Sequence, residues 1–415
     1  MEENSRSWRQ AETKNHMSIQ NAPDDVNLVL SIKEKMEDVS LLSCICRVSE
    51  GSSEDNENMY FPKFVSIGPL HNKNDSLKAT EDQKWRYLNA LLGRKPNLEA
   101  RLDHCVKALK ILEQKARKCY QEEIDMQSNE FVKMLLLDGC FIIEFFLKYA
   151  IKGLRRSDDP CFNTRDRFFR LRCDLILLEN QIPFFVLQQL FHLVPIPRQC
   201  SQSLTELALH FFRIIIPGDI QYFQEKFGEE YFNHLLDLVR QCYLPTYLEV
   251  QFSGEQKILY CATKLKEVGI GFKKATTTTL LNIKFVDGVI KIPPFKIQNH
   301  TEILFRNFIA MEHCHLDCTK YITSYAILME QLICSDKDVR LLHQRRILPN
   351  GLDKGEEILA LFKKLHVNID VKDFYYRSLG EQVHGYERTK WHQRREVNFS
   401  KFYLYDGFPE LVNWF

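Results

Sequence analysis

The sequence has no apolar run long enough to cross a membrane. A spanning helix needs about 20 mostly apolar residues with few charges, and the longest candidate, residues 175–196, is interrupted by Glu179, Asn180 and Pro183. Net charge is also nearly absent, because the 415 residues carry a formal charge of +1. No global field therefore attracts nucleic acid or an anionic membrane, and we expect no nucleic-acid partner.

Motifs of common chemistries are missing as well. We find no Gly-x-Ser-x-Gly, His-Glu-x-x-His, Gly-x-Gly-x-x-Gly or P-loop pattern. The start of the chain lacks the apolar stretch of a secretory signal. The 13 cysteines are odd in number and repeat no spacing, which favours free buried thiols in a reducing compartment over a disulfide framework. We expect no cofactor and a cytoplasmic or peripheral membrane location.

Apolar residues recur at helical spacing through most of the chain. The pattern predicts helices over residues 98–119, 129–149, 204–212, 221–244, 260–268, 301–332 and 354–366. Thr80 and Gln83 form a capping-box pattern, which predicts a further helix with Trp85 on its buried face. Because proline breaks a helix interior, we expect one helix to end near Glu179 and another to begin at Pro183.

One segment in the second half predicts strands. Residues 281–292 alternate apolar and polar side chains on both sides of Asp287-Gly288, the favoured two-residue hairpin turn. The expected fold class is mainly α, a multi-helix core with a small β-hairpin or sheet insertion in the C-terminal half. We divide the chain into a disordered lead with a short helix (1–40), a main domain (41–395) and an aromatic tail that lacks a membrane span (396–415). Within the main domain we expect a helical core (41–250) and a mixed α/β part (251–395).

Two apolar blocks, residues 134–147 and 171–187, contain acids within the buried pattern. An unpaired buried charge is expensive, so these side chains need partners or a purpose. The candidate buried polar cluster comprises Asp138, Glu144, Asp174, Glu179, Asn180 and Gln181.

Two interpretations of this cluster remain open. Carboxylates on facing helices can hold a divalent cation or perform acid–base chemistry. The structural interpretation, which we favour, has Asp138 accepting backbone donors near Gly139 and Asp174 pairing with Arg170 or Arg172. Residues 179–181 would then satisfy backbone groups that are freed at the following proline. We expect Asp158-Asp159, in the polar linker after the first block, to be solvated.

A second candidate site lies within residues 312–318. On a helix, Cys314 and Cys318 fall four residues apart with His315 beside them, and such ligands suit zinc. No partner motif with Cys-x-x-Cys or His-x-x-x-His spacing accompanies them. We therefore prefer thiols that pack as small apolar groups, and we predict no metal site.

Several motifs together resemble one plant family, known as domain of unknown function 247, from about residue 45 to residue 391. They are residues 64–69 (Phe-Val-Ser-Ile-Gly-Pro), 84–87, 134–144, 174–185, 262–265, 301–307 and 321–325. The resemblance implies a mainly helical fold. Members of the family usually end in one membrane-spanning helix, and some grass members are associated with self-incompatibility. Here an aromatic stretch begins at Phe399 and the chain then stops.

This resemblance implies a non-enzymatic interaction or recognition protein at or near a membrane, with a protein or peptide partner. Recognition would use surface loops that differ between members, such as Glu50–Met59 and Lys152–Arg167. The basic and aromatic residues around Trp391 offer a membrane contact. The alternative is a small-ligand-binding protein or an uncharacterised enzyme that uses the buried carboxylates.

Overall fold

The computed structural model describes residues 43–48, 59–72, 75–227, 232–245, 258–277, 279–314, 318–350, 354–365 and 374–390. The expectations for residues 1–40, for 50–58, for His315 and for the segment from Trp391 onward lie outside these residues. The described residues all belong to one compact unit. The division of the main domain at residue 250 stays a prediction.

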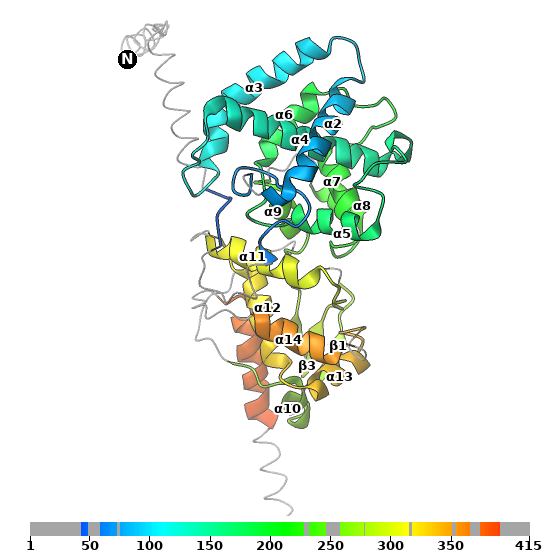
Figure 1. Ribbon diagram of the computed structural model, residues 1–415. Coiled ribbons are helices and arrows are strands. Elements are labelled where there is room, and N and C mark those ends of the chain that lie inside the picture. The colour runs from blue at the N-terminus through cyan, green and yellow to red at the C-terminus, as the bar shows by residue number, and fades with distance from the viewer. Residues whose placement is uncertain are drawn as a thin grey trace, which may run out of the picture. The chain divides into compact units, whose positions relative to one another are not determined.

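Helices dominate, as the apolar spacing predicts (Figure 1). The helices with defined bounds are η2 (Asp75–Leu77), α2 (Lys78–Leu92), α3 (Leu98–Lys118), α4 (Ser128–Ala150), η3 (Lys152–Leu154), α5 (Arg165–Asp174), α6 (Phe184–Leu193), α7 (Leu204–Phe212), α8 (Ile220–Lys226), α9 (Leu235–Gln241), α10 (Ala262–Glu267), α11 (Thr301–Cys314), α12 (Tyr321–Leu332), α13 (Asp336–Gln344) and α14 (Gly355–Leu365). Residues 377–390 are also helical. The fold class is therefore mainly α.

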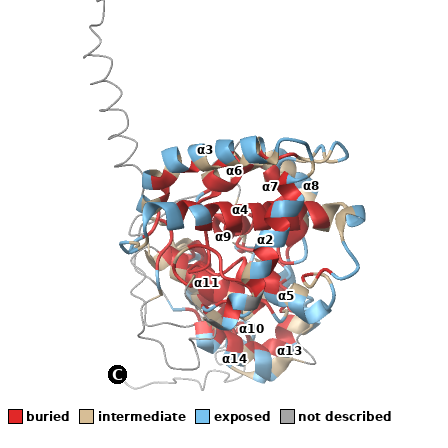
Figure 2. Ribbon diagram, turned by 45° about the horizontal axis from the view of Figure 1, so that its top comes forward, coloured by how far each residue is buried: buried red, intermediate tan, exposed pale blue. Residues whose placement is uncertain are grey.

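Helix α4 is the centre of the helical core. It packs against α2, α3, α6 and α7, and it is buried around its whole circumference from Met134 to Lys148. Figure 2 shows this helix in red, whereas α3 carries an exposed outer face. A helix that is apolar on all sides is typical of a protein interior or a membrane span. Among the described residues, no helix is both long and apolar enough to cross a bilayer.

The predicted hairpin is present and belongs to a small sheet. Strands β2 (Lys284–Val286) and β3 (Val289–Ile292) pair antiparallel. Asp287 and Gly288 both have positive φ, 52° and 77°, as the predicted turn requires. Strand β1 (Gly271–Lys274), which lies in the region expected to form a small sheet but shows no alternating pattern of its own, pairs parallel with β3 and completes the order β1-β3-β2. Only Phe272 of β1 is buried, so the strand has almost no apolar alternation to detect.

Several predicted helices differ from the observed ones. The segment 301–332 forms two helices, because Glu312 near the end of α11 accepts N–H groups from Ile322 and Thr323 at the start of α12. Similarly, residues 221–244 divide into α8 and α9. The predicted capping box is wrong, since the Thr80 hydroxyl donates to the Phe64 carbonyl and α2 begins before it. The expectation for Trp85 is also wrong, because its side chain is 46% exposed.

Candidate functional site

The buried polar residues of the second block surround one turn of the chain. Helix α5 ends at Asp174, five residues before the predicted end, and α6 begins after Pro183. Residues 174–181 between them, which we call the central turn, are all buried. Their backbone groups are outside regular secondary structure and need other partners. The polar side chains of the turn therefore face a dense set of donors and acceptors.

Asp174 binds an extended segment from the first part of the chain. Its Oδ1 accepts the N–H of Lys63 at 2.9 Å, and its Oδ2 accepts those of Phe64 and Val65 at 2.7 and 2.8 Å. Burial raises the pKa of this carboxyl to about 7, although the N–H donors act in the opposite direction. The expected pairing of Asp174 with Arg170 or Arg172 is wrong, because backbone amides occupy both oxygens.

Asn180 continues this attachment of the extended segment. Its Oδ1 accepts the N–H of Ile67 at 2.7 Å, and its Nδ2 donates to the carbonyls of Val65 and Asp174 at 3.0 Å. The side chain thus supplies both a donor and an acceptor to a backbone that has no neighbouring strand. Asparagine suits this position because its amide combines both groups.

Gln181 closes the central turn and connects it to α9. Its Nε2 donates to the carbonyls of Leu175 and Leu177 at 3.0 and 2.8 Å, and its Oε1 accepts the N–H of Leu236. The Gln181 carbonyl itself leaves no room at Gly68, where an added Cβ would lie 2.3 Å from the oxygen. Gly68 also has a φ of 78°, so both space and backbone conformation require glycine there.

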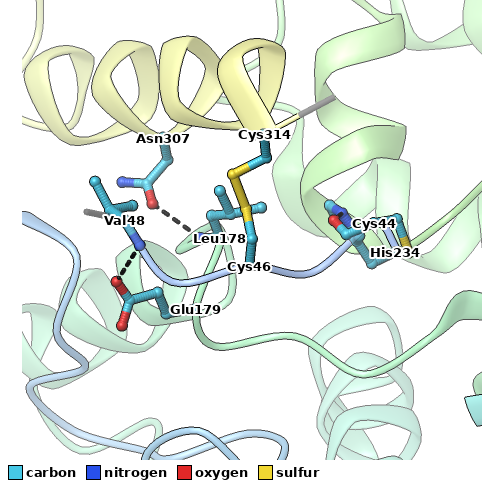
Figure 3. The surroundings of a disulfide bond; sticks show 8 residues. All are labelled: Cys44, Cys46, Val48, Leu178, Glu179, His234, Asn307 and Cys314. Atoms are coloured by element: carbon cyan, nitrogen blue, oxygen red, sulfur yellow. Dashed lines mark hydrogen bonds between the residues drawn. A yellow bond between two sulfur atoms is a disulfide. The ribbon is translucent and has the colours of Figure 1, made fainter. Parts of the chain in front are cut away.

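Glu179 holds a second segment, near the start of the described chain. One oxygen accepts the N–H of Val48 at 2.9 Å, and the other lies 3.0 Å from His71 Nε2 and 3.6 Å from Arg47. Figure 3 shows Glu179 beside Val48 and the adjacent disulfide. Leu178, the preceding residue, donates its N–H to Asn307 of α11 at 2.8 Å. The central turn is therefore bonded to the segment at Val48, to residues 63–67, to α9 and to α11.

The acids of the first block have partners of their own. Asp138 pairs with the buried Lys84 at 2.6 Å and accepts the N–H of Gly68 at 2.8 Å. Burial lowers the pKa of Lys84, but Asp138 and Glu81 outweigh it and raise the pKa above its ordinary value. Glu144 pairs with Arg94. The expected donors near Gly139 are not those that bind Asp138, because the extended segment and α2 supply them instead.

The four predicted carboxylates thus do not share one cavity. Asp138 and Asp174 bind N–H groups of the extended segment, Glu179 binds that of Val48, and Glu144 pairs with Arg94. None of them lines either of two pockets, of about 560 and 220 Å³, in the described part of the chain. These carboxylates hold segments of backbone in place. The motif at residues 174–181 has this structural role for the extended segment 63–68.

The second candidate site, within residues 312–318, does not have the free thiols that the zinc hypothesis requires. Cys314 forms a disulfide with Cys46 (Figure 3), so the expectation of free thiols is wrong for these two cysteines. The other eleven cysteines are free. Cys318 is half-buried, and the described residues contain no cluster of histidine, cysteine and acidic side chains that could hold a metal ion.

Sequence reasoning missed the partners of the buried acids. Glu312 is wholly buried near the end of α11, and its Oε1 accepts a hydrogen bond from Arg240 Nη2 at 2.8 Å. The one available signal was a lysine or arginine inside an apolar pattern, as at Lys84 and Arg240. Asp159 was expected to be solvated, but it is 3% exposed and binds Tyr87 and Lys148. Its neighbour Asp158 is exposed as expected.

The fold and these contacts define a mainly α-helical protein in which buried polar side chains hold extended segments around a central turn. The chain belongs to the family DUF247, described as plant proteins of unknown function, whose model matches residues 45–408. Two of the motifs that carry the family resemblance, residues 64–69 and 174–185, are bonded to each other through Asp174 and Asn180.

Two curated plant proteins are similar over most of the chain. UPF0481 protein At3g47200 of Arabidopsis thaliana is 30% identical over 376 residues, which cover 84% of this chain and 78% of that protein. Putative UPF0481 protein At3g02645 of the same plant is 20% identical over 430 residues, with 80% of each chain covered. No solved structure matches this chain.

Proposed function

We propose that the protein is a non-enzymatic recognition protein that binds a protein or peptide through its surface loop Lys152–Arg167, called here the 152–167 loop. The observation that carries this proposal is the buried support of the loop. Asp159, near its middle, accepts Tyr87 Oη at 2.7 Å, Lys148 Nζ at 2.8 Å and the N–H of Cys161 at 3.1 Å. A loop held in this way keeps one conformation at its exposed positions.

Further contacts hold the start of the loop. Arg155 donates to the carbonyls of Lys148 and Tyr149, both at 2.7 Å, and its guanidinium lies 4.5 Å from the centre of the Phe162 ring. Between these anchors, Arg156 and Asp158 project into solvent with side chains 79% and 65% exposed. Loops that present polar groups from a rigid scaffold are common binding elements. The 152–167 loop therefore combines a fixed base with a charged tip.

The roles of the buried acids support recognition over catalysis. A catalytic carboxylate must reach its substrate, whereas Asp138, Asp174 and Glu179 bind backbone N–H groups inside the protein. The alternative function, an enzyme that uses these carboxylates, would need two of them to face one substrate, and their bonds to backbone N–H groups do not favour this. We therefore place the function on the surface.

We further propose that the protein acts at or near a membrane, because the family that it resembles usually carries a membrane-spanning helix; its self-incompatibility members imply the recognition role. The basic and aromatic residues around Trp391 would supply the contact, and they lie outside the described residues. The Cys46–Cys314 disulfide weakens the prediction of a reducing compartment, because disulfides persist mainly in oxidising surroundings, whereas the eleven free cysteines favour it. The compartment of the protein is therefore best determined by direct imaging.

The test of recognition is selection of ligands from a displayed peptide library on the immobilised full chain. We expect peptides that bind saturably and lose about ten-fold in affinity to the variant R156A/D158A, because a few central side chains dominate most interfaces. The matched control is D103A/K107A, which removes another exposed ion pair, on α3, and also leaves net charge unchanged. Peptides that bind wild type and both variants equally would refute the role of the loop.

A further inference from the structure

A pocket of about 560 Å³ lies at the start of α11, and no residue of the 152–167 loop lines it. Most of its lining comes from residues 214–218 after α7, residues 274–277 at the end of β1, and residues 294–301 before and at the start of α11, and Tyr243 and Leu280 complete it. Its volume falls within the range of about 300–1,000 Å³ that is usual for small-molecule sites. We call it the His300 pocket.

His300 is the buried polar group of this pocket. Its side chain is 7% exposed, and within the described chain neither ring nitrogen has a hydrogen-bond partner. Burial and the positive charge of Arg172 lower its pKa to about 4, so the ring is neutral at neutral pH. A neutral imidazole offers one donor and one acceptor. A ligand in the pocket would meet this donor and this acceptor.

The pocket also has a positive rim. Lys274 and Lys296 line it with exposed side chains, and neither makes an ion pair with the residues that the structure describes. No aspartate or glutamate is among the lining residues. Arg172, whose charge reaches His300, pairs with no carboxylate in the described chain and stacks on Phe168 and Phe211 instead. These charges together favour an anion.

The first turn of α11 adds to the positive field. Thr301 lines the pocket, and its hydroxyl oxygen accepts the N–H of Gln298 at 2.9 Å. The first N–H groups of a helix have no acceptor within the helix, and its dipole favours negative charge there. Glu302 in the same turn is neutralised by Arg306 at 3.1 Å. The helix start therefore acts in the same direction as the lysines.

Part of the remaining wall is apolar. Ile215, Tyr243 and Phe295 line one side of the pocket. The Tyr243 hydroxyl donates to the Ile215 carbonyl, and the N–H of Phe295 donates to Ile347 at 2.8 Å. These bonds keep both aromatic rings in place, so an apolar ligand body meets a preformed surface. Such apolar walls with a few convergent polar groups are typical of ligand sites.

We propose that the His300 pocket binds a small organic anion, a carboxylate or phosphate monoester on an aromatic or other apolar body. The acidic group lies at Lys274, Lys296 and the start of α11, with His300 as a neutral hydrogen-bond partner. The apolar body lies against Ile215 and Phe295. This site is independent of the recognition proposal, because it uses none of the residues of the 152–167 loop.

The experiment is isothermal titration calorimetry of the full chain with matched probes. The probes are 2-naphthoate, 2-naphthyl phosphate, the neutral 2-naphthamide and inorganic phosphate. We expect at least one naphthyl anion to bind saturably, and to bind more weakly as salt is raised because the lysines are exposed to screening. The two naphthyl anions tell carboxylate from phosphate recognition. Neutral 2-naphthamide and inorganic phosphate, each lacking one half of the ligand, should bind about ten-fold more weakly.

Variants then assign the binding to this pocket. K274Q/K296Q should weaken the naphthyl anion by about ten-fold, since two exposed charge contacts are lost. The matched control is K266Q/K273Q, which removes the same charge from exposed lysines that do not line the pocket. Thr276→Phe, at an exposed lining position, should also weaken binding by filling the entrance.

Three outcomes would overturn the proposal. The first is that none of the four probes binds saturably. The second is that 2-naphthamide binds as tightly as the anions, which would leave the positive rim without a role. The third is that K274Q/K296Q and K266Q/K273Q weaken binding equally, which would indicate a general charge effect.

Discussion

At the scale of single residues, each buried acid is stabilised by the hydrogen-bond donors that surround it. Asp174 has both oxygens occupied by backbone N–H groups of residues 63–65. Sequence reasoning identified the acid and its need for a partner, because charge inside an apolar block is costly. It chose nearby arginines as partners, since only local spacing can be read from a sequence. The true donors are more than 100 residues away along the chain.

Replacing Asp174 with alanine should therefore strongly destabilise the protein. The change leaves three backbone N–H groups, one buried and two partly buried, without their acceptor, and we expect the free energy of unfolding to fall by roughly 3–5 kcal/mol. Urea unfolding followed by circular dichroism measures it. The control, Asp158→Ala at an exposed position, should leave the midpoint unchanged. Equal midpoints for the two variants would contradict the role of Asp174.

His300 predicts a dependence of stability on pH. Its pKa is about 4 in the folded protein and about 6.5 when unfolded, so the unfolded state binds the proton more readily. The contribution of neutral His300 is fully present above pH 6.5 and is lost as the pH falls to 4. The stability advantage of wild type over His300→Gln should thus shrink by about 3 kcal/mol between pH 7 and pH 4.

Urea unfolding of both proteins at the two pH values measures this difference. The control is His192→Gln, which removes an exposed imidazole. If the difference in free energy of unfolding between wild type and His300→Gln is the same at pH 7 and pH 4, the pKa of His300 is not lowered in the folded protein.

At the scale of elements, the helices follow their sequence pattern, but their ends follow tertiary partners. Helices α3 and α4 match the predicted ranges closely, because long apolar periodicity depends only on the local chain. Helix α5 ends early, where Asp174 and the central turn bind other segments. The break between α11 and α12 likewise depends on Glu312, which accepts N–H groups from α12 while paired with Arg240.

The Cys46–Cys314 disulfide joins two such elements across 268 residues of sequence. Cys314→Ser should lower the free energy of unfolding by about 2–4 kcal/mol, since a cross-link restricts the unfolded chain. The control is Cys318→Ser, a free half-buried thiol nearby, which should change stability much less. Urea unfolding with and without a reductant measures the effect, and reduced wild type should match Cys314→Ser. A reductant that leaves wild-type stability unchanged would count against the disulfide as a stabilising link.

At the scale of the molecule, the parts before and after residue 250 are joined by buried bonds. Arg240 pairs with Glu312, Leu178 donates to Asn307, and the disulfide lies beside them. Breaking one partner of a buried ion pair leaves an uncompensated charge. These bonds favour folding of the two parts as one unit, and the division at residue 250 within the main domain stays a prediction.

Unfolding of the whole chain should accordingly be one cooperative transition. We expect the same urea midpoint from circular dichroism and from the fluorescence of tryptophan, including Trp85 on α2. Glu312→Gln should move this single midpoint to lower urea without splitting it, because Arg240 then lacks a charged partner. Two separate midpoints in wild type would show that the parts fold independently.

The sequence alone determined the fold class, the long helices and the β2–β3 hairpin, because periodicity and turn chemistry act over a few residues. It also identified Asp174 and Asn180 as buried groups that need partners. Only the tertiary structure decided which backbone they bind, that Cys46 meets Cys314, and that His300 lines a pocket with two lysines. Those contacts join residues far apart in the chain, and no local pattern encodes which distant donor will fill a given site.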